Sequence, residues 1–377
     1  MTTALDRVAR VRTVTIKHML ATPILYGEWV MRHREFALVR VDAESGLSGF
    51  GYCLTRDGPI AEIVSRSIAP VYVGSPVGDP EEVFYRALWT NHAVHAAGIG
   101  MRALSVVDIA AWDLAAKASG QSIARFLGGE LRPMKATAIV GYPPTISPDE
   151  TARQVRSLWE AGWRRFKVPI SPSLDLSVAR LEAVRDAVPE GWVGFDINMV
   201  LHRAEEVLAF EERVRGLHLG WIEDVVPPGD AAMVAAVRRG SGTPVAMGDE
   251  QGGSYHPEAL LALDAVDVLR VDATTNGGVT RLREIVRRAR DKGVAVSPHM
   301  FPHVHSRVMA ALGFDVPIEW GIPGTGVHPM DDCLDQPVVR DGNMAPLADG
   351  LGFGVLVDPD WVGSQVVSDP DGALADL

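Results

Sequence analysis

From about Met134 onward, short apolar runs rich in valine, isoleucine and alanine alternate with segments whose apolar residues recur at helical spacing. This alternation is typical of repeated strand–helix units around a parallel sheet. Eight strands are expected, at Ala136–Val140, Arg165–Val168, Val193–Ile197, Leu219–Glu223, Pro244–Met247, Val266–Val271, Val294–Ser297 and Val316–Trp320. The pattern therefore predicts an α/β fold of the (β/α)₈ TIM-barrel type, or its (β/α)₇β variant if the last unit is imperfect.

Helix signals fill most of the gaps between these strands. Ser147 to Glu150 form a capping box with Pro148 at the first helical position, and Gly162 suits the end of that helix. Further helices are expected at Ala179–Ala187, Ala204–Val214, Asp230–Arg239, Pro257–Leu263, Thr280–Lys292 and Val304–Leu312.

The first 130 residues have a different pattern. Val11–Met19 and Phe36–Val41 alternate like antiparallel strands, and Val106–Lys117 has the pattern of a long apolar helix. We therefore expect an α+β capping domain over residues 1–130 and a barrel over 131–340. The acidic, glycine-containing segment 341–377 is expected to return to the cap.

Composition narrows the class of function. The 377 residues carry 36 Lys+Arg against 48 Asp+Glu, a net charge of −12, with no long basic run. Binding to nucleic acid or to an anionic membrane needs a basic surface, so neither partner is expected. Two cysteines, Cys53 and Cys333, cannot form a disulfide framework, and no apolar run approaches the roughly 20 residues of a membrane span. A soluble, cytoplasmic protein is expected.

Polar residues follow nearly every barrel strand, where the active site of such a barrel lies. They are Lys167, Asp196, Asn198, Glu223, Glu250, Asp272, His299 and Glu319. From Asp196 to Glu319 the successive ionisable residues are 27, 27, 22, 27 and 20 positions apart, each about one strand–helix unit. Six ionisable groups are therefore expected to face one mouth.

Three of these carboxylates, Asp196, Glu223 and Glu250, end adjacent strands. A set of oxygen ligands without cysteine or histidine suits Mg²⁺, and converging carboxylates are costly without a cation. The alternative is that each is a helix cap or a salt-bridge partner, which is the more common role for a single carboxylate. Three carboxylates in register favour one bound Mg²⁺.

Asp272 and His299 end the next two strands. A carboxylate at that distance can hold an imidazole in one tautomer and raise its basicity. A base beside a metal that binds a substrate carboxylate suggests removal of the proton α to that carboxylate.

These residues together resemble the enolase superfamily and, within it, the mandelate racemase subgroup. The resemblance spans nearly the whole chain. It rests on the helix Ala110–Lys117, Asp196-Ile197-Asn198, Glu223-Asp224, Gly248-Asp249-Glu250, Val271-Asp272 with Gly277-Gly278, Ser297-Pro298-His299, Glu319-Trp320-Gly321 and Gly350-Leu351-Gly352.

The resemblance implies Asp196, Glu223 and Glu250 as Mg²⁺ ligands and His299, paired with Asp272, as the base. It further implies that Glu319 hydrogen-bonds the substrate carboxylate and that Asn198 contacts substrate. Cap loops near Thr22–Trp29 and Tyr52–Asp57 would select the substrate, with Tyr26, His33 and Arg34 in reach. Related barrels commonly form dimers or octamers, so a homo-oligomer is expected.

One departure from the subgroup changes the expected reaction. The subgroup often ends its second barrel strand with Lys-x-Lys, whose second lysine is a base, whereas this chain has Lys167-Val168-Pro169. Lys167 should still point inward, with a substrate-carboxylate or electrostatic role, and a shift that lets it act as a base is the less favoured alternative. A single His–Asp pair suffices for dehydration of an aldonic or aldaric acid to a 2-keto-3-deoxy acid, which we expect. The alternatives are a racemase or epimerase and a non-catalytic carboxylate-binding protein.

Two other sites are less favoured. His299, His303 and His305 suggest zinc, but His303 and His305 would not share a helix face. Gly277-Gly278 before a helix could hold a phosphate, but a tight turn is the simpler interpretation because no phosphate-binding motif accompanies it.

Overall fold

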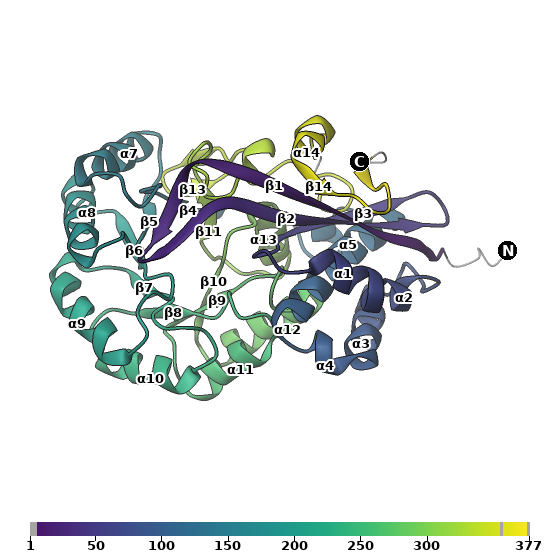
Figure 1. The fold of residues 1–377 in the computed structure, drawn as a ribbon, viewed down its shortest axis with the longest axis horizontal. Coiled ribbons are helices and arrows are strands. Elements are labelled where there is room, and N and C mark those ends of the chain that lie inside the picture. Colours follow the sequence, from purple (N-terminus) through teal and green to yellow (C-terminus); the bar gives the residue numbers. More distant parts are fainter. Residues whose placement is uncertain (1–5, 355–356, 375–377) are drawn as a thin grey trace.

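The computed structural model describes residues 6–354 and 357–374, which form a barrel unit and a cap that lies over one end of it (Figure 1). All eight expected barrel strands are present. They are β4 (Met134–Ile139), β5 (Arg165–Pro169), β6 (Trp192–Asp196), β7 (Trp221–Glu223), β8 (Val245–Met247), β9 (Val268–Val271), β10 (Ala295–Pro298) and β11 (Ile318–Gly321). Parallel pairing runs in order from β4 to β10, and β11 pairs with β4. The sheet therefore curls into a barrel whose seam lies between β10 and β11.

Seven helices alternate with these strands on the outside of the barrel. They are α7 (Pro148–Glu160), α8 (Leu174–Ala187), α9 (Ala204–Val214), α10 (Ala231–Gly240), α11 (Tyr255–Ala262), α12 (Gly278–Asp291) and α13 (Pro302–Ala311). The capping box at Ser147 is present, because its side chain accepts from Glu150 N. After β11 the described residues 322–354 contain a 3₁₀ turn, η3 (Asp331–Cys333), but no α-helix. The imperfect last unit is thus confirmed, and the barrel is of the (β/α)₇β type.

The cap is built on an antiparallel sheet in the order β14-β1-β2-β3. Its strands β1 (Val8–Tyr26) and β2 (Trp29–Ala43) are longer than the sequence pattern suggested, and β3 (Ser48–Leu54) completes the meander. The long hairpin of β1 and β2 crosses the barrel mouth toward β5 and β6 (Figure 1). Its tip, Tyr26 to Trp29, lines a cavity together with residues 198–202, which follow β6. The cap thereby brings side chains from β1 and β2 to the end of the barrel where sequence analysis placed the site.

The other cap elements are helical. They are α1 (Ile60–Ile63), the π-helix η1 (Val64–Ile68), α2 (Ala69–Tyr72), α3 (Pro80–Thr90), α4 (His92–His95), α5 (Gly98–Ala118) and α6 (Ile123–Phe126). The central helix α5 packs on β3 and on the barrel helix α12. It contains the apolar helix that was expected at Val106–Lys117.

The last part of the chain connects both units. The hairpin of β12 (Val339–Arg340) and β13 (Asn343–Met344) extends the barrel sheet at β4. Beyond it, α14 (Pro359–Gln365) leads into β14 (Val366–Ser368), which pairs antiparallel with β1. The end of the described chain therefore contributes a strand to the cap sheet.

The cap and barrel meet along a polar seam. Asp108 in α5 accepts hydrogen bonds from Thr280 N (3.0 Å) and Thr280 Oγ1 (2.8 Å), and Ser105 Oγ accepts from Gly277 N (2.9 Å). Gly277 and Gly278 have φ values of 103° and 66°, so they form the tight turn that begins α12. A Cβ on Gly278 would overlap the Asp108 side chain, which explains the glycine there.

A second seam carboxylate, Asp113, joins three segments that are distant in sequence. Its oxygens accept from Phe50 N (2.9 Å), Phe353 N (2.7 Å) and Lys117 Nζ (2.6 Å). Asp113 thus fixes β3 and the glycine-rich stretch 350–354 to helix α5.

Among the described residues no helix is both long and apolar enough to cross a membrane. Cys53 and Cys333 are both free thiols.

Candidate active site

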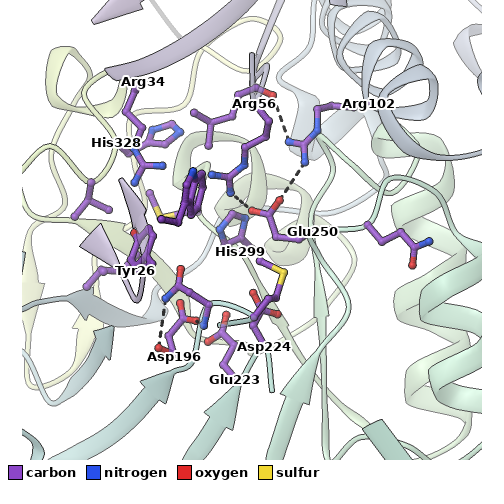
Figure 2. A pocket seen from close by; sticks show the side chains of 18 of the residues that line it. Tyr26, Arg34, Arg56, Arg102, Asp196, Glu223, Asp224, Glu250, His299 and His328 are labelled. Carbon is purple, nitrogen blue, oxygen red and sulfur yellow. Dashed lines mark hydrogen bonds and ion pairs between the residues drawn. The ribbon is translucent and has the colours of Figure 1, made fainter. Parts of the chain in front are cut away.

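A cavity of about 460 Å³ lies between the barrel mouth and the cap (Figure 2). Its barrel side is formed by residues at strand ends, among them Lys167, Asp196, Asn198, Glu223, Asp224, Glu250 and His299. Its cap side is formed by Tyr26, Trp29, Arg34, Arg56 and Arg102, and His328 comes from the loop after β11. The size suits a small polar molecule.

Three carboxylates converge at the ends of β7 and β8. Glu223, Asp224 and Asp249 each offer one oxygen, and these oxygens lie within 4.8 Å of one another. All three residues are buried, yet Glu223 Oε2, Asp224 Oδ1 and both oxygens of Asp249 have no hydrogen-bond partner. Burial and then the neighbouring carboxylates raise the pKa of Asp224 well above its ordinary value. Buried acceptors of one charge without donors fit a divalent cation bound through oxygen ligands.

Asp196, at the end of β6, lies beside this group. Its charge contributes to the raised pKa of both Glu223 and Asp224. Its Oδ1 accepts from Asn198 N (2.9 Å), and its Oδ2 lies 3.4 Å from Lys167 Nζ. The sequence-predicted ligands Asp196 and Glu223 are therefore brought together.

Glu250, the third predicted ligand, is not part of this group. Its Oε2 lies 3.2 Å from Arg102 Nη2, and its Oε1 accepts from the Arg56 guanidinium. Burial raises the pKa of Glu250, but the two arginines outweigh burial and hold this pKa below its ordinary value. Both Glu250 oxygens thus have cationic partners from the cap, whereas those of Asp249 have no hydrogen-bond donor.

The local backbone explains why Asp249, and not Glu250, lies in the group of carboxylates. Glu223 pairs with Ala246 and Ala246 with Val268, so strict alternation along β8 would bring Gly248 and then Glu250 to the barrel interior. Gly248 has a φ of 144°, which interrupts the alternation one residue before Asp249. A Cβ at Gly248 would lie 2.4 Å from Arg270 O, so only glycine fits this turn.

Strained backbone marks other strand ends around the cavity. Asn198 and Met199 follow Asp196, Asp224 follows Glu223, and Met300 and Phe301 follow His299, all with φ between 44° and 59°. Left-handed conformations cost free energy in residues other than glycine and cluster at functional sites. Here they turn the chain sharply just after the residues that face the cavity.

Lys167 and Arg270 lie beneath the carboxylates. Lys167 Nζ lies 3.1 Å from Glu223 Oε1 and 2.9 Å from Glu319 Oε1. Arg270 Nε donates to Glu223 Oε1 (2.9 Å), and its Nη2 lies 2.7 Å from Glu319 Oε2. Burial lowers the pKa of Lys167, but these carboxylates outweigh burial and raise this pKa above its ordinary value. The lysine is therefore held as a cation.

Glu319 lies between these two cations and is their counterion. Burial would raise its pKa, but Arg270 and Lys167 outweigh burial and lower the pKa of Glu319 to about 2. The predicted hydrogen bond between Glu319 and a substrate carboxylate stays a prediction. Arg270 was missed because it lies inside β9, not at the strand end.

His299 and Asp272 meet as the sequence predicted. His299 Nδ1 is 3.0 Å from Asp272 Oδ2, and it is also 3.4 Å from Asp249 Oδ2. Although burial lowers it, the charges of Asp249 and Asp272 raise the pKa of His299 to about 9. Asp272 is itself fixed by Thr274 N, which donates to Oδ1 (2.7 Å). The imidazole is therefore oriented, with Nε2 left to face the cavity.

The cap residues divide between two cavities. Tyr26 lines the main cavity, and its hydroxyl lies 2.7 Å from that of Tyr142. His33 is not brought into that cavity, because its Nε2 lies 2.7 Å from Asp57 Oδ1 in a neighbouring hollow of about 210 Å³. Arg56, Arg102 and His328 were not singled out from the sequence, because neither the cap residues nor the loop after β11 show a period that points to the barrel mouth.

The histidines that suggested zinc do not form a site. His305 Nε2 accepts from Ala273 N (2.9 Å) and its Nδ1 lies 2.7 Å from Met300 O, so both ring nitrogens are used structurally. Among the described residues the possible metal-binding group contains carboxylates alone.

Comparisons with known proteins agree with this architecture. The family model for the mandelate racemase/muconate lactonizing enzyme N-terminal domain matches residues 8–128, and that of the enolase C-terminal domain-like family matches residues 150–361. The chain is 27% identical to D-galactarolactone cycloisomerase from Agrobacterium fabrum, across 97% of this chain and 100% of that protein. It is 26% identical to L-talarate/galactarate dehydratase from Salmonella typhimurium, across 92% and 89%.

Among solved structures, a racemase from Streptomyces coelicolor with bound magnesium superposes with a TM-score of 0.86 at 21% identity, covering 96% of this chain and 100% of that one. The three similar proteins carry three different reaction names, so similarity defines the family and not the reaction. On the two family models, the chain belongs to the enolase superfamily, in the mandelate racemase/muconate lactonizing enzyme subgroup.

Proposed function

We propose that this protein is a Mg²⁺-dependent dehydratase of an acid sugar, an aldonate or aldarate, and that it forms a 2-keto-3-deoxy acid. The observation that carries the proposal is one oriented base, His299 on Asp272, beside the group of buried carboxylates without partners. On β5 a buried proline, Pro169, stands where the subgroup often has a second base. The similarity to an acid-sugar dehydratase supports the same reaction class.

The carboxylates at the ends of β6 to β8 would hold the metal. Asp196, Glu223 and Asp249 come one from each strand end, and Asp224 lies within the same group. A bound Mg²⁺ supplies positive charge at the substrate carboxylate, which makes the α-proton more acidic. We assign the third ligand to Asp249 in place of Glu250, because Asp249 has unpartnered oxygens and Glu250 does not.

His299 would carry the proton in both halves of the reaction. In the neutral imidazole Nδ1–H donates to Asp272, so the unprotonated Nε2 takes the proton from the carbon α to the substrate carboxylate. The same Nε2–H then protonates the β-hydroxyl, the carbon–oxygen bond breaks, and water leaves. The resulting enol tautomerises to the 2-keto acid, which balances the reaction as a simple loss of water.

Lys167 acts as a fixed positive charge in this scheme. The neighbouring carboxylates keep it protonated, so it favours negative charge on the substrate without serving as a base. Glu319, which is itself paired with Arg270, holds the lysine in place from below. With no second base on the β5 side, proton return to the opposite face of the α-carbon is disfavoured, and elimination is the favoured outcome.

The test is a screen of the purified protein with Mg²⁺ against mono- and dicarboxylic acid sugars in D₂O, followed by proton NMR. A 2-keto-3-deoxy product is expected. Deuterium at carbon 2 without loss of water would contradict dehydration and identify a racemase or epimerase.

The His299→Asn variant tests the assignment of the base. We expect turnover to fall by roughly 10²- to 10⁴-fold, the usual contribution of a general base. His218→Asn is the matched control, because His218 is exposed before β7, at the opposite end of the barrel, and asparagine tolerates its φ of 50°. Unchanged turnover in His299→Asn would refute the mechanism.

A further inference from the structure

The two sides of the cavity carry opposite charge. Carboxylates lie at the ends of β6, β7 and β8, whereas Arg34 and His328 lie on the side away from Asp196, Glu223 and Asp224 (Figure 2). The order of strands around the barrel explains the separation, because His328 follows β11, which is separated from β6 by β4 and β5. A substrate held at the carboxylate side must extend toward Arg34 and His328.

Arg34 is a buried cation without a counterion. Its side chain comes from β2 and lines the cavity, and the residue is only 6% exposed. Within the described residues 6–354 and 357–374, no carboxylate lies within ion-pair distance of it, and Nε reaches only Gly326 O, at 3.5 Å. The neighbouring arginines differ, since Arg56 and Arg102 are both paired with Glu250. Burying an unpaired guanidinium is costly, so its position indicates an anion that arrives with the ligand.

His328 lies in the same wall of the cavity. It is 1% exposed, and its Nδ1 lies 2.9 Å from Asp331 Oδ2. Asp331 is held in turn by the Tyr52 hydroxyl, which donates to Oδ1 (2.8 Å), and Phe36 and Phe301 contact the imidazole edge to face, with centroids 5.0 and 4.7 Å away. Within the described residues neither ring nitrogen has a hydrogen-bond partner, because the contact between Nδ1 and Asp331 is an ion-pair contact only. The neighbouring side chains fix this imidazole in the cavity wall.

We infer that Arg34 and His328 form a second recognition point, for a carboxylate at the far end of the substrate, so that the protein selects linear dicarboxylic over monocarboxylic acid sugars. This inference rests on the proposed function and specifies its substrate class. A guanidinium binds a carboxylate through two parallel hydrogen bonds, whereas the terminal hydroxymethyl group of an aldonate leaves the charge unbalanced. Tyr26 and Tyr142, whose hydroxyls meet in the cavity wall, would face the hydroxylated middle of the chain.

The test measures binding separately from turnover. The His299→Asn protein with saturating Mg²⁺ is titrated calorimetrically with matched pairs that differ only at carbon 6: galactarate with galactonate, glucarate with gluconate, and mannarate with mannonate. We expect at least one dicarboxylate to bind at least about tenfold more tightly than its partner, as a charge-assisted hydrogen bond implies. Adding Arg34→Gln should abolish this preference and change monocarboxylate affinity by less than about threefold.

Two further variants sharpen the result. Arg32→Gln removes the same charge from the same strand at an exposed position outside the main cavity, so the preference should remain. Arg34→Lys keeps the charge but loses the planar fork, and it should retain only part of the preference. Thermal unfolding of each variant shows whether the fold is retained.

The outcomes separate the two proposals. Equal binding within all pairs, no binding of any dicarboxylate, or an Arg34→Gln effect that is equal for both members would overturn the recognition of a second carboxylate. A dicarboxylate preference in a protein that forms no 2-keto-3-deoxy acid would instead refute the dehydratase proposal and leave this inference standing.

Discussion

Buried carboxylates occur in two regions of this protein, and their surroundings differ. At the seam between cap and barrel, Asp108 and Asp113 have hydrogen-bond donors on both oxygens. At the barrel mouth, Glu223, Asp224 and Asp249 have at least one oxygen each without a donor. All five residues are buried, so burial alone does not distinguish them.

We interpret this difference as a division between carboxylates that serve the fold and carboxylates that would bind a ligand. A buried acceptor without a partner costs folding free energy, and proteins keep such groups where a ligand completes them. By this criterion Glu250 belongs with the structural carboxylates, because two cap arginines hold it, although it is adjacent in sequence to Asp249.

The largest expected effect is on Mg²⁺ affinity, when the adjacent residues Asp249 and Glu250 are substituted in turn. Asp249→Asn should weaken Mg²⁺ binding by at least roughly 100-fold, since residues that merely orient a ligand cost about 10- to 100-fold. Glu250→Gln should weaken it by less than about tenfold, because Glu250 pairs with Arg56 and Arg102 and does not orient any of the proposed ligands. Calorimetric titration with Mg²⁺ measures both.

Stability gives an independent readout of the same pair. In metal-free protein, Asp249→Asn should raise the melting temperature, because it removes a buried charge that repels Asp224. If Glu250→Gln proved the more damaging variant for Mg²⁺ affinity, Glu250 would be the ligand after all and the contrast would fail.

Most of the fold could be predicted from the sequence, because the barrel signal is local. Each strand, such as Val193–Ile197, is a short apolar run between helical segments, and its observed counterpart β6 ends within one residue of the prediction. The cap hairpin was predicted too short, because most of the outer part of β1 is half-buried or exposed and lacks alternation. Its length depends on packing over the barrel mouth, which is a tertiary property.

A site residue could be predicted where it ends a predicted barrel strand and faces inward by the alternation of that strand. Asp196, Glu223, Asp272 and His299 follow this rule and meet at the mouth. Asp249 was not predicted, because the turn at Gly248 makes Asp249 face inward in place of its neighbour Glu250. Arg34 was noted from the sequence but could not be ranked, and nothing marked His328, because contacts between cap and barrel carry no signal in a single sequence.

The next largest effect concerns a seam carboxylate. Asp113→Ala should lower the free energy of unfolding by about 2–4 kcal/mol, because it removes the acceptor of Phe50 N and Phe353 N and the ion-pair partner of Lys117 Nζ. Mg²⁺ affinity should stay unchanged, which is the reverse of the Asp249→Asn result. Urea unfolding measures the loss, and Asp186→Ala, at an exposed aspartate in α8, is the control. A weakened Mg²⁺ site in folded Asp113→Ala protein would contradict the division between the two regions.

The smallest effect is a pH dependence at the other seam carboxylate. Burial, against the hydrogen bonds from Thr280, raises the pKa of Asp108 from 3.8 to about 7. The folded state therefore holds this proton more tightly than the unfolded state. Its contribution to stability is full below about pH 4 and is lost as the pH rises toward 7.

The Asp108→Asn variant isolates this contribution, because asparagine cannot ionise and fills nearly the same volume. Between pH 5 and pH 8 the wild-type protein should lose more than about 1 kcal/mol of unfolding free energy relative to the variant. The carboxylates at the barrel mouth titrate in both proteins, so their effects cancel in the difference at equal Mg²⁺ concentration. Parallel pH profiles would mean that Asp108 is already ionised in the fold, and that its two hydrogen bonds from Thr280 outweigh its burial.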